Sequence, residues 1–144
     1  MRRLLLVIVS ITLLNSGSGF PGGEHTDSNA ITGFSVTFNF RNASYGFELS
    51  VEDVSSTPSW AQPENGKPPL LIRTAIEVSK KELAKYHPEI PSWELASVGL
   101  QPVGTSSKWY YVVSWRPKGS HFKDTFSIPV LMDGSPVKLQ SKQA

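Results

Sequence analysis

The sequence predicts an α+β domain in which one helix packs on a curved antiparallel sheet, and three observations support this. Residues 34–40 and 45–51 alternate apolar and polar side chains, which is the period of a strand with one buried face. Residues 72–86 carry apolar side chains three and four apart, which is the period of a helix. Residues 108–116, KWYYVVSWR, are rich in aromatic and β-branched residues, which favour strands. The predicted order is an N-terminal hairpin, a loop, the helix and a four-stranded meander.

Composition and charge limit the classes of protein that the chain can belong to. Its 144 residues fit one domain, and 39% hydrophobic residues suffice for one modest core. The absence of cysteine excludes disulfides and thiolate metal sites. The 14 basic and 12 acidic side chains give a formal charge of +2, but Arg2 and Arg3 lie in a segment expected to be removed. The mature chain should be near neutral, so no nucleic-acid partner is expected.

Residues 1–19 have the layout of a secretory signal peptide. Arg2 and Arg3 form a positive start, Leu4–Leu14 an apolar run, and residues 15–19 a small polar end. An apolar helix of this length spans only about 16 Å against a hydrocarbon core of about 30 Å, so a membrane anchor is not expected. We expect cleavage after Gly19, a flexible mature N-terminus at residues 20–30, a domain at 31–139 and a tail at 140–144. The protein should be secreted or periplasmic, with no stable membrane anchor after cleavage.

The first hairpin is predicted to turn at residues 41–44. Asn42, Ala43 and Ser44 match the N-glycosylation acceptor pattern, so Asn42 is a candidate modification site. Residues 55–69 then contain four prolines, which exclude both a helix and an interior strand. Trp60 in this loop either covers the edge of the core or offers an exposed aromatic platform for a sugar or a peptide.

The helix is predicted to begin at Pro68-Pro69, since proline is tolerated in a first helical turn, and to end near Tyr86-His87. Strand-like runs follow at residues 93–103, 108–116 and 122–132, with Pro129 suggesting an edge strand or a bulge. Asp133-Gly134 is a hairpin signal, and residues 137–139 would form a short last strand.

The run at residues 108–116 is predicted to be the central strand of the sheet. Trp109, Tyr111, Val113 and Trp115 share its better core face, because successive side chains alternate in direction. The sequence leaves open whether this aromatic face is core or interface. Trp60, Trp109 and Trp115 are therefore the candidate binding surface, for a protein, a peptide or a glycan.

No catalytic, cofactor-binding or metal-binding residue is predicted. His25, His87 and His121 are far apart and lack metal-ligand spacing. Glu48 and Glu52 would share a strand face, where two carboxylates could do acid–base chemistry only in an environment that distinguishes them. Two solvated side chains are the simpler interpretation. His121 with Asp124 is an equally weak pair.

The order of elements resembles the cystatin-like and PepSY-like α+β domains, in which a curved antiparallel sheet cradles one helix. The residues that carry the resemblance are the helix after Pro68-Pro69, the KWYYVV strand and the closing segment VLMDGSPVK at 130–138. The chain is also similar to small exported bacterial proteins of unknown function. Cystatin inhibitors have a Q-x-V-x-G hairpin, whereas here the corresponding residues 101–105 read QPVGT, with glycine one residue early and an intruding proline.

The resemblance implies a non-enzymatic binding or modulating role, often toward peptidases or the cell envelope. We therefore expect an exported binding module that is not an enzyme. The alternative is a small enzyme with a pocket between helix and sheet, which would need converging polar groups. The lesser alternative is a cystatin-like peptidase inhibitor.

Overall fold

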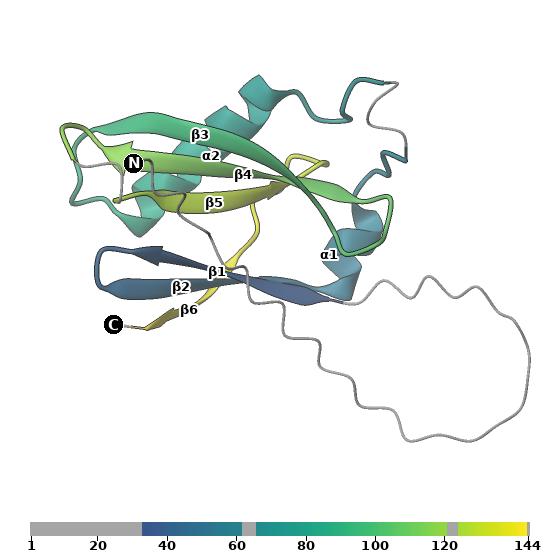
Figure 1. The fold of residues 1–144 in the computed structure, drawn as a ribbon, viewed down its shortest axis with the longest axis horizontal. Coiled ribbons are helices and arrows are strands. Elements are labelled where there is room, and N and C mark those ends of the chain that lie inside the picture. Colours follow the sequence, from purple (N-terminus) through teal and green to yellow (C-terminus); the bar gives the residue numbers. More distant parts are fainter. Residues whose placement is uncertain (1–32, 62–65, 121–123, 144) are drawn as a thin grey trace, which may run out of the picture.

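The computed structural model describes residues 33–61, 66–120 and 124–143, which form a mixed α+β body with two antiparallel three-stranded sheets and one main helix (Figure 1). The elements are β1 (Phe34–Phe40), β2 (Ala43–Leu49), α1 (Val51–Ser56), α2 (Ile72–Tyr86), β3 (Trp93–Pro102), β4 (Trp109–Pro117), β5 (Phe126–Leu131) and β6 (Leu139–Gln143). The α+β class is the one predicted from the sequence. In these ranges, neither helix is long and apolar enough to cross a membrane.

β1 and β2 form the predicted hairpin and pair antiparallel over their full length. The turn between them places Arg41 in the left-handed region, with φ at 54°. The period-two prediction is confirmed for β2 and for the end of β1, because the side chains on the inner face are buried. These are Phe40, Tyr45, Phe47 and Leu49.

The structure has two sheets where the sequence predicted one, with strand orders β1-β2-β6 and β3-β4-β5. β1 lies beside β5 where the two sheets meet (Figure 1). The predicted strand at residues 137–139 does not extend the second sheet. Pro136 lacks the N–H that a ladder needs, and pairing with β5 is limited to a bridge from Val130 to Pro136 with two backbone hydrogen bonds beside it. Leu131 N donates to Ser135 O (2.9 Å), and Val137 N donates to Pro129 O (3.0 Å). The chain then crosses to the first sheet, where β6 pairs with β2 through residues that the sequence suggested were a tail.

α2 packs on one face of the second sheet. It begins at Ile72 rather than at Pro68-Pro69, because the backbone is still extended at Leu71, with ψ at 141°. Pro68 itself precedes a proline, which disfavours the helical conformation at that residue. The predicted end at Tyr86 is confirmed. The buried side chains of α2 are Ala75, Ser79 and Leu83, and the two small ones allow close approach to the sheet.

β4 is the central strand of the second sheet, as predicted, and β5, which holds Pro129, is an edge strand. Tyr111, Val113 and Trp115 are buried on the β4 face that meets α2. Trp115 Nε1 donates to Ser79 Oγ of α2 (3.0 Å), and Tyr111 Oη donates to Leu70 O, in the segment just before α2 (3.0 Å). The core face chosen from the sequence is thus confirmed at these three residues.

α1 was not predicted, because the alternating pattern of β2 seemed to continue to Val51. A capping box begins the helix instead: Ser50 Oγ accepts from Asp53 N (3.1 Å), and Ser50 N donates to Asp53 Oδ2 (3.4 Å). Val51 is therefore half exposed, and Val54 is the buried residue of the helix. Glu52 was expected to share a strand face with Glu48. It lies on α1 instead, so the two carboxylates are on different elements.

Candidate binding surface

Trp60 and Trp109 lie together at one end of the second sheet. The loop after α1 runs beside the start of β4: Trp60 N donates to Ser107 O (2.7 Å), and Ser59 forms a bridge with Lys108. Trp109 Nε1 donates to Trp60 O (3.0 Å), and the two indole rings meet edge to face with centroids 5.8 Å apart. We call this pair the indole ledge.

The indole ledge covers part of the core and is itself partly accessible to solvent. Both rings are half-buried and pack against the core. Trp60 Nε1 is buried and has no hydrogen-bond partner within the described residues, so the polar edge of this ring faces inward. Trp60 therefore covers the edge of the core and leaves part of its surface accessible, and its role as a platform for a sugar or a peptide stays a prediction.

Lys108 holds the loop in place beneath the ledge. Its Nζ donates to Thr57 O and lies 3.4 Å from Ser55 O, at the C-terminal end of α1. A cation is favourable at that end of a helix, because the last carbonyl groups carry partial negative charge. The sequence analysis assigned Lys108 no role, since no local pattern brings residues 55–57 to residue 108.

Trp115 does not belong to this surface. Only 4% of the residue is exposed, and its indole N–H is bonded to Ser79 of α2. Trp115 points into the sheet–helix interface, where it is a core residue. Of the three candidate tryptophans, the structure brings together Trp60 and Trp109.

Asn42 is exposed in the turn between β1 and β2, where a modifying enzyme could reach it. The hydroxyl of its acceptor motif, Ser44 Oγ, donates to Asn39 Oδ1 (2.7 Å). Glycosylation at Asn42 stays a prediction.

His87 is buried in a cluster of aromatic side chains, which we call the His87 cluster. From the sequence, His87 was placed only at the end of the helix. His87 is 4% exposed, and its ring contacts Phe126, Phe40, Tyr45 and Trp93 at centroid distances of 4.7, 5.0, 5.6 and 5.9 Å. These residues come from both sheets, so no local sequence signal could reveal the cluster. His87 Nδ1 lies 2.9 Å from Glu89 Oε1, and this hydrogen bond lowers the pKa of Glu89.

The other candidate groups considered from the sequence are histidines and carboxylates. His25 and His121 lie outside the described residues, and no cluster of three or more His, Asp or Glu side chains suited to a metal occurs within them. A depression of about 230 Å³ lies between α1 and the segment after β5. It is lined by Asp53, Leu131, Ser135, Pro136, Val137 and Lys138. No residue of α2 lines this depression.

The hairpin at residues 101–105 joins β3 to β4. Val103 is 4% exposed, so the residue that would correspond to the cystatin valine points into the core. Gly104 supplies a positive φ of 55° at the turn.

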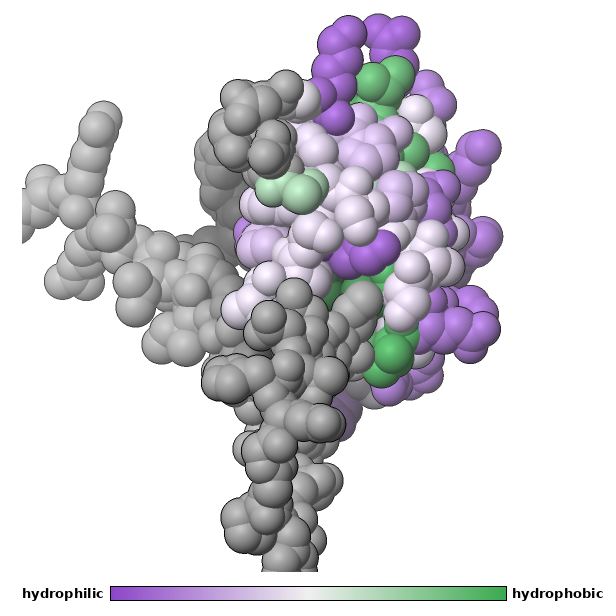
Figure 2. Space-filling view, turned by 90° about the vertical axis from the view of Figure 1, so that its right-hand side faces the viewer, coloured by the Kyte–Doolittle hydropathy of each residue, from purple (hydrophilic) through white to green (hydrophobic). Residues whose placement is uncertain are grey.

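One face of the molecule is shown in Figure 2, where exposed hydrophobic residues form small separate patches among hydrophilic ones. Scattered apolar residues of this kind are normal on a protein surface.

No family model, curated protein or solved structure matches the chain.

Proposed function

We propose that this protein is a non-catalytic binding or modulating module that acts in the periplasm or outside the cell. The observation that carries the proposal is the indole ledge, two half-buried tryptophans held by one hydrogen bond from the Trp109 indole and one from the Trp60 backbone. Tryptophan supplies a large rigid contact area at low entropic cost, which is why it is enriched at binding sites. The ledge would stack on a sugar ring or pack against an apolar side chain of a peptide or a protein.

The compartment in this proposal is supported by the signal-like residues 1–19 and by the lack of cysteine, which leaves the fold independent of redox conditions. The cystatin-like resemblance would add a modulating role toward peptidases. The buried position of Val103 gives the inhibitory hairpin no support, so the ledge is the better candidate surface.

The test compares matched variants of the protein spanning residues 20–144. Immobilised protein would be exposed to envelope extract of the source cells, and each retained component would be identified, purified and measured by calorimetry. Trp60→Ala should weaken the affinity at least about tenfold, as expected for a tryptophan at the centre of an interface. Leu95→Ala removes an apolar side chain that is 42% exposed and pairs with Trp115, toward the other end of β4 from Trp109, so it should leave the affinity unchanged.

Circular dichroism would establish that each variant is folded. The proposal fails if wild type retains nothing beyond the bare matrix. It also fails if folded Trp60→Ala binds the purified partner as tightly as wild type.

A further inference from the structure

β3 is an outer strand of the second sheet, and within the described ranges no strand pairs with its free side. An edge strand of this kind presents backbone N–H and C=O groups in a row, ready to pair with another strand. β3 is also long, running from Trp93 to Pro102.

The backbone groups that face the free side can be assigned from the pairing with β4. Val103 N donates to Lys108 O (2.9 Å), which makes these residues a hydrogen-bonded pair. Hydrogen-bonded and non-hydrogen-bonded pairs alternate along an antiparallel ladder, so Val98, Leu100 and Pro102 direct their backbone groups away from β4. The free edge therefore offers the N–H groups of Val98 and Leu100 and the C=O groups of all three residues.

Among the described residues, the other sheet edges have covering segments or a charged side chain, whereas β3 is interrupted only near its ends, by a bulge between Leu95 and Ser97 and by Pro102. The outer side of β5 is occupied, since Leu131 N donates to Ser135 O (2.9 Å) and Pro129 O accepts from Val137 N. β6 carries Lys142, and β1 lies beside β5. Charged side chains and covering segments are the usual means of keeping an edge unpaired.

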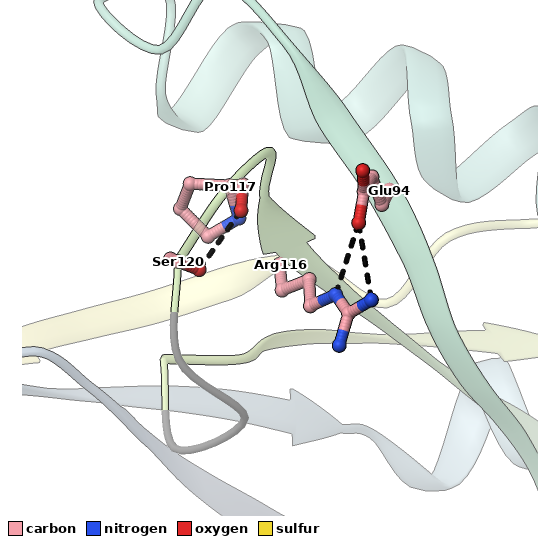
Figure 3. A network of polar contacts seen from close by, with 4 residues as sticks. All are labelled: Glu94, Arg116, Pro117 and Ser120. Carbon is pink, nitrogen blue, oxygen red and sulfur yellow. Dashed lines mark hydrogen bonds and ion pairs between the residues drawn. The ribbon is translucent and has the colours of Figure 1, made fainter.

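The β3 edge is also electrically neutral. No charged side chain occurs from Leu95 to Ser107. Glu94, just before this run, is held by its neighbour on β4: Arg116 Nε and Nη2 each lie 3.1 Å from Glu94 Oε2 (Figure 3).

We propose that the free edge of β3 pairs antiparallel with β3 of a second copy of this chain, about a two-fold axis at Gly99. Residues 97–101, SVGLQ, read polar, apolar, glycine, apolar, polar in either direction. The two-fold places Val98 opposite Leu100 of the second copy, and both direct their backbone groups outward. A contact that uses the same patch on both subunits is the commonest form of homodimer.

The symmetric pattern of this neutral stretch favours a second copy as the occupant of the edge. The pairing sets Ser97 opposite Gln101 of the second copy, so no charge faces a like charge or loses its partner. The paired stretch is short, because a bulge between Leu95 and Ser97 ends it on one side and Pro102, which has no N–H, on the other. The dimer should therefore be weak and reversible.

Gly99 provides the test, since it lies on the two-fold axis. A Cβ there would meet only Val112 O at 3.9 Å, and no positive φ opposes a side chain. Directly opposite Cβ atoms lie about 5 Å apart in antiparallel pairs, where like charges repel. Gly99→Lys and Gly99→Glu should each weaken dimerisation about fivefold, whereas an equimolar mixture of the two should dimerise at least as tightly as wild type.

Sedimentation velocity over a wide concentration series would measure these association constants with the purified full chain, and circular dichroism would show that each variant is folded. Gly99→Ser keeps the edge neutral and should dimerise like wild type. A wild type that is monomeric throughout would overturn the proposal. So would charged variants that associate as well as wild type, or a mixture no tighter than its separate components.

Discussion

Removal of the Ser79 hydroxyl should destabilise the protein through the tryptophan that it supports. Ser79 Oγ accepts from Trp115 Nε1 (3.0 Å) and donates to Ile76 O (2.9 Å) in a site where Ser79 is fully buried. Ser79→Ala leaves the indole N–H without an acceptor, at a cost of about 1–3 kcal/mol. Alanine is the better helix former by about 0.5 kcal/mol, which offsets part of the loss. The net change should be about 1–2 kcal/mol in the free energy of unfolding, or a Tm lower by about 5–10 °C.

Urea and thermal unfolding of Ser79→Ala would be compared with Lys80→Ala, an exposed change on the same helix that should stay within about 0.5 kcal/mol of wild type. A double-mutant cycle with Trp115→Phe isolates the hydrogen bond, because phenylalanine retains a ring but lacks the N–H. If Ser79→Ala costs no more than Lys80→Ala, the argument from the buried indole is wrong. The same holds if its cost is unchanged in the Trp115→Phe background.

Three further changes test other parts of the fold. Ser50→Ala removes the capping box of α1 and should cost about 1 kcal/mol, with faster amide exchange in residues 51–56; equal exchange in both proteins would contradict this role. Gly134→Ala places a side chain at a φ of 88° and should lower the free energy of unfolding in urea by about 1–2 kcal/mol. Gly99 has no positive φ, so Gly99→Ala should not cause this loss, and equal losses in the two variants would refute the role of strain at Gly134. The hydrogen bond to His87 lowers the pKa of Glu89 below its ordinary value of 4.5, so the carboxylate stabilises the fold above that value and ceases to do so as pH falls through the lowered pKa. Glu89→Gln should therefore be less stable than wild type at neutral pH but equal to it in strong acid, and a pH-independent difference would contradict the assignment.

Local periodicity predicted those parts of the fold that depend on near neighbours. The alternation in β2 and the three-and-four spacing in α2 placed both elements, and Pro129 correctly marked an edge strand. The pairing of β6 with β2 could not be predicted. The last strand could join either sheet, and contacts with residues distant in the sequence decide which one it joins. α1 had a local signal, Ser50 followed by Asp53, but the alternation of β2 hid it.

The candidate surface was predicted in part. Trp60 and Trp109 lie together, whereas Trp115 is buried, since a strand of aromatic residues reads the same whether its face meets a helix or solvent. The His87 cluster had no signal at all, because its aromatic neighbours converge only after both sheets have formed.

The pairing of β6 with β2 joins residues such as Ser44 and Gln143, which lie roughly 100 positions apart in the chain. A chain is synthesised from its N-terminus, so the first hairpin emerges long before the strand that completes its sheet. During that interval one side of β2 is open to any strand that meets it. A premature stop codon before Leu139 would make this exposure permanent, and we expect such truncated products to aggregate.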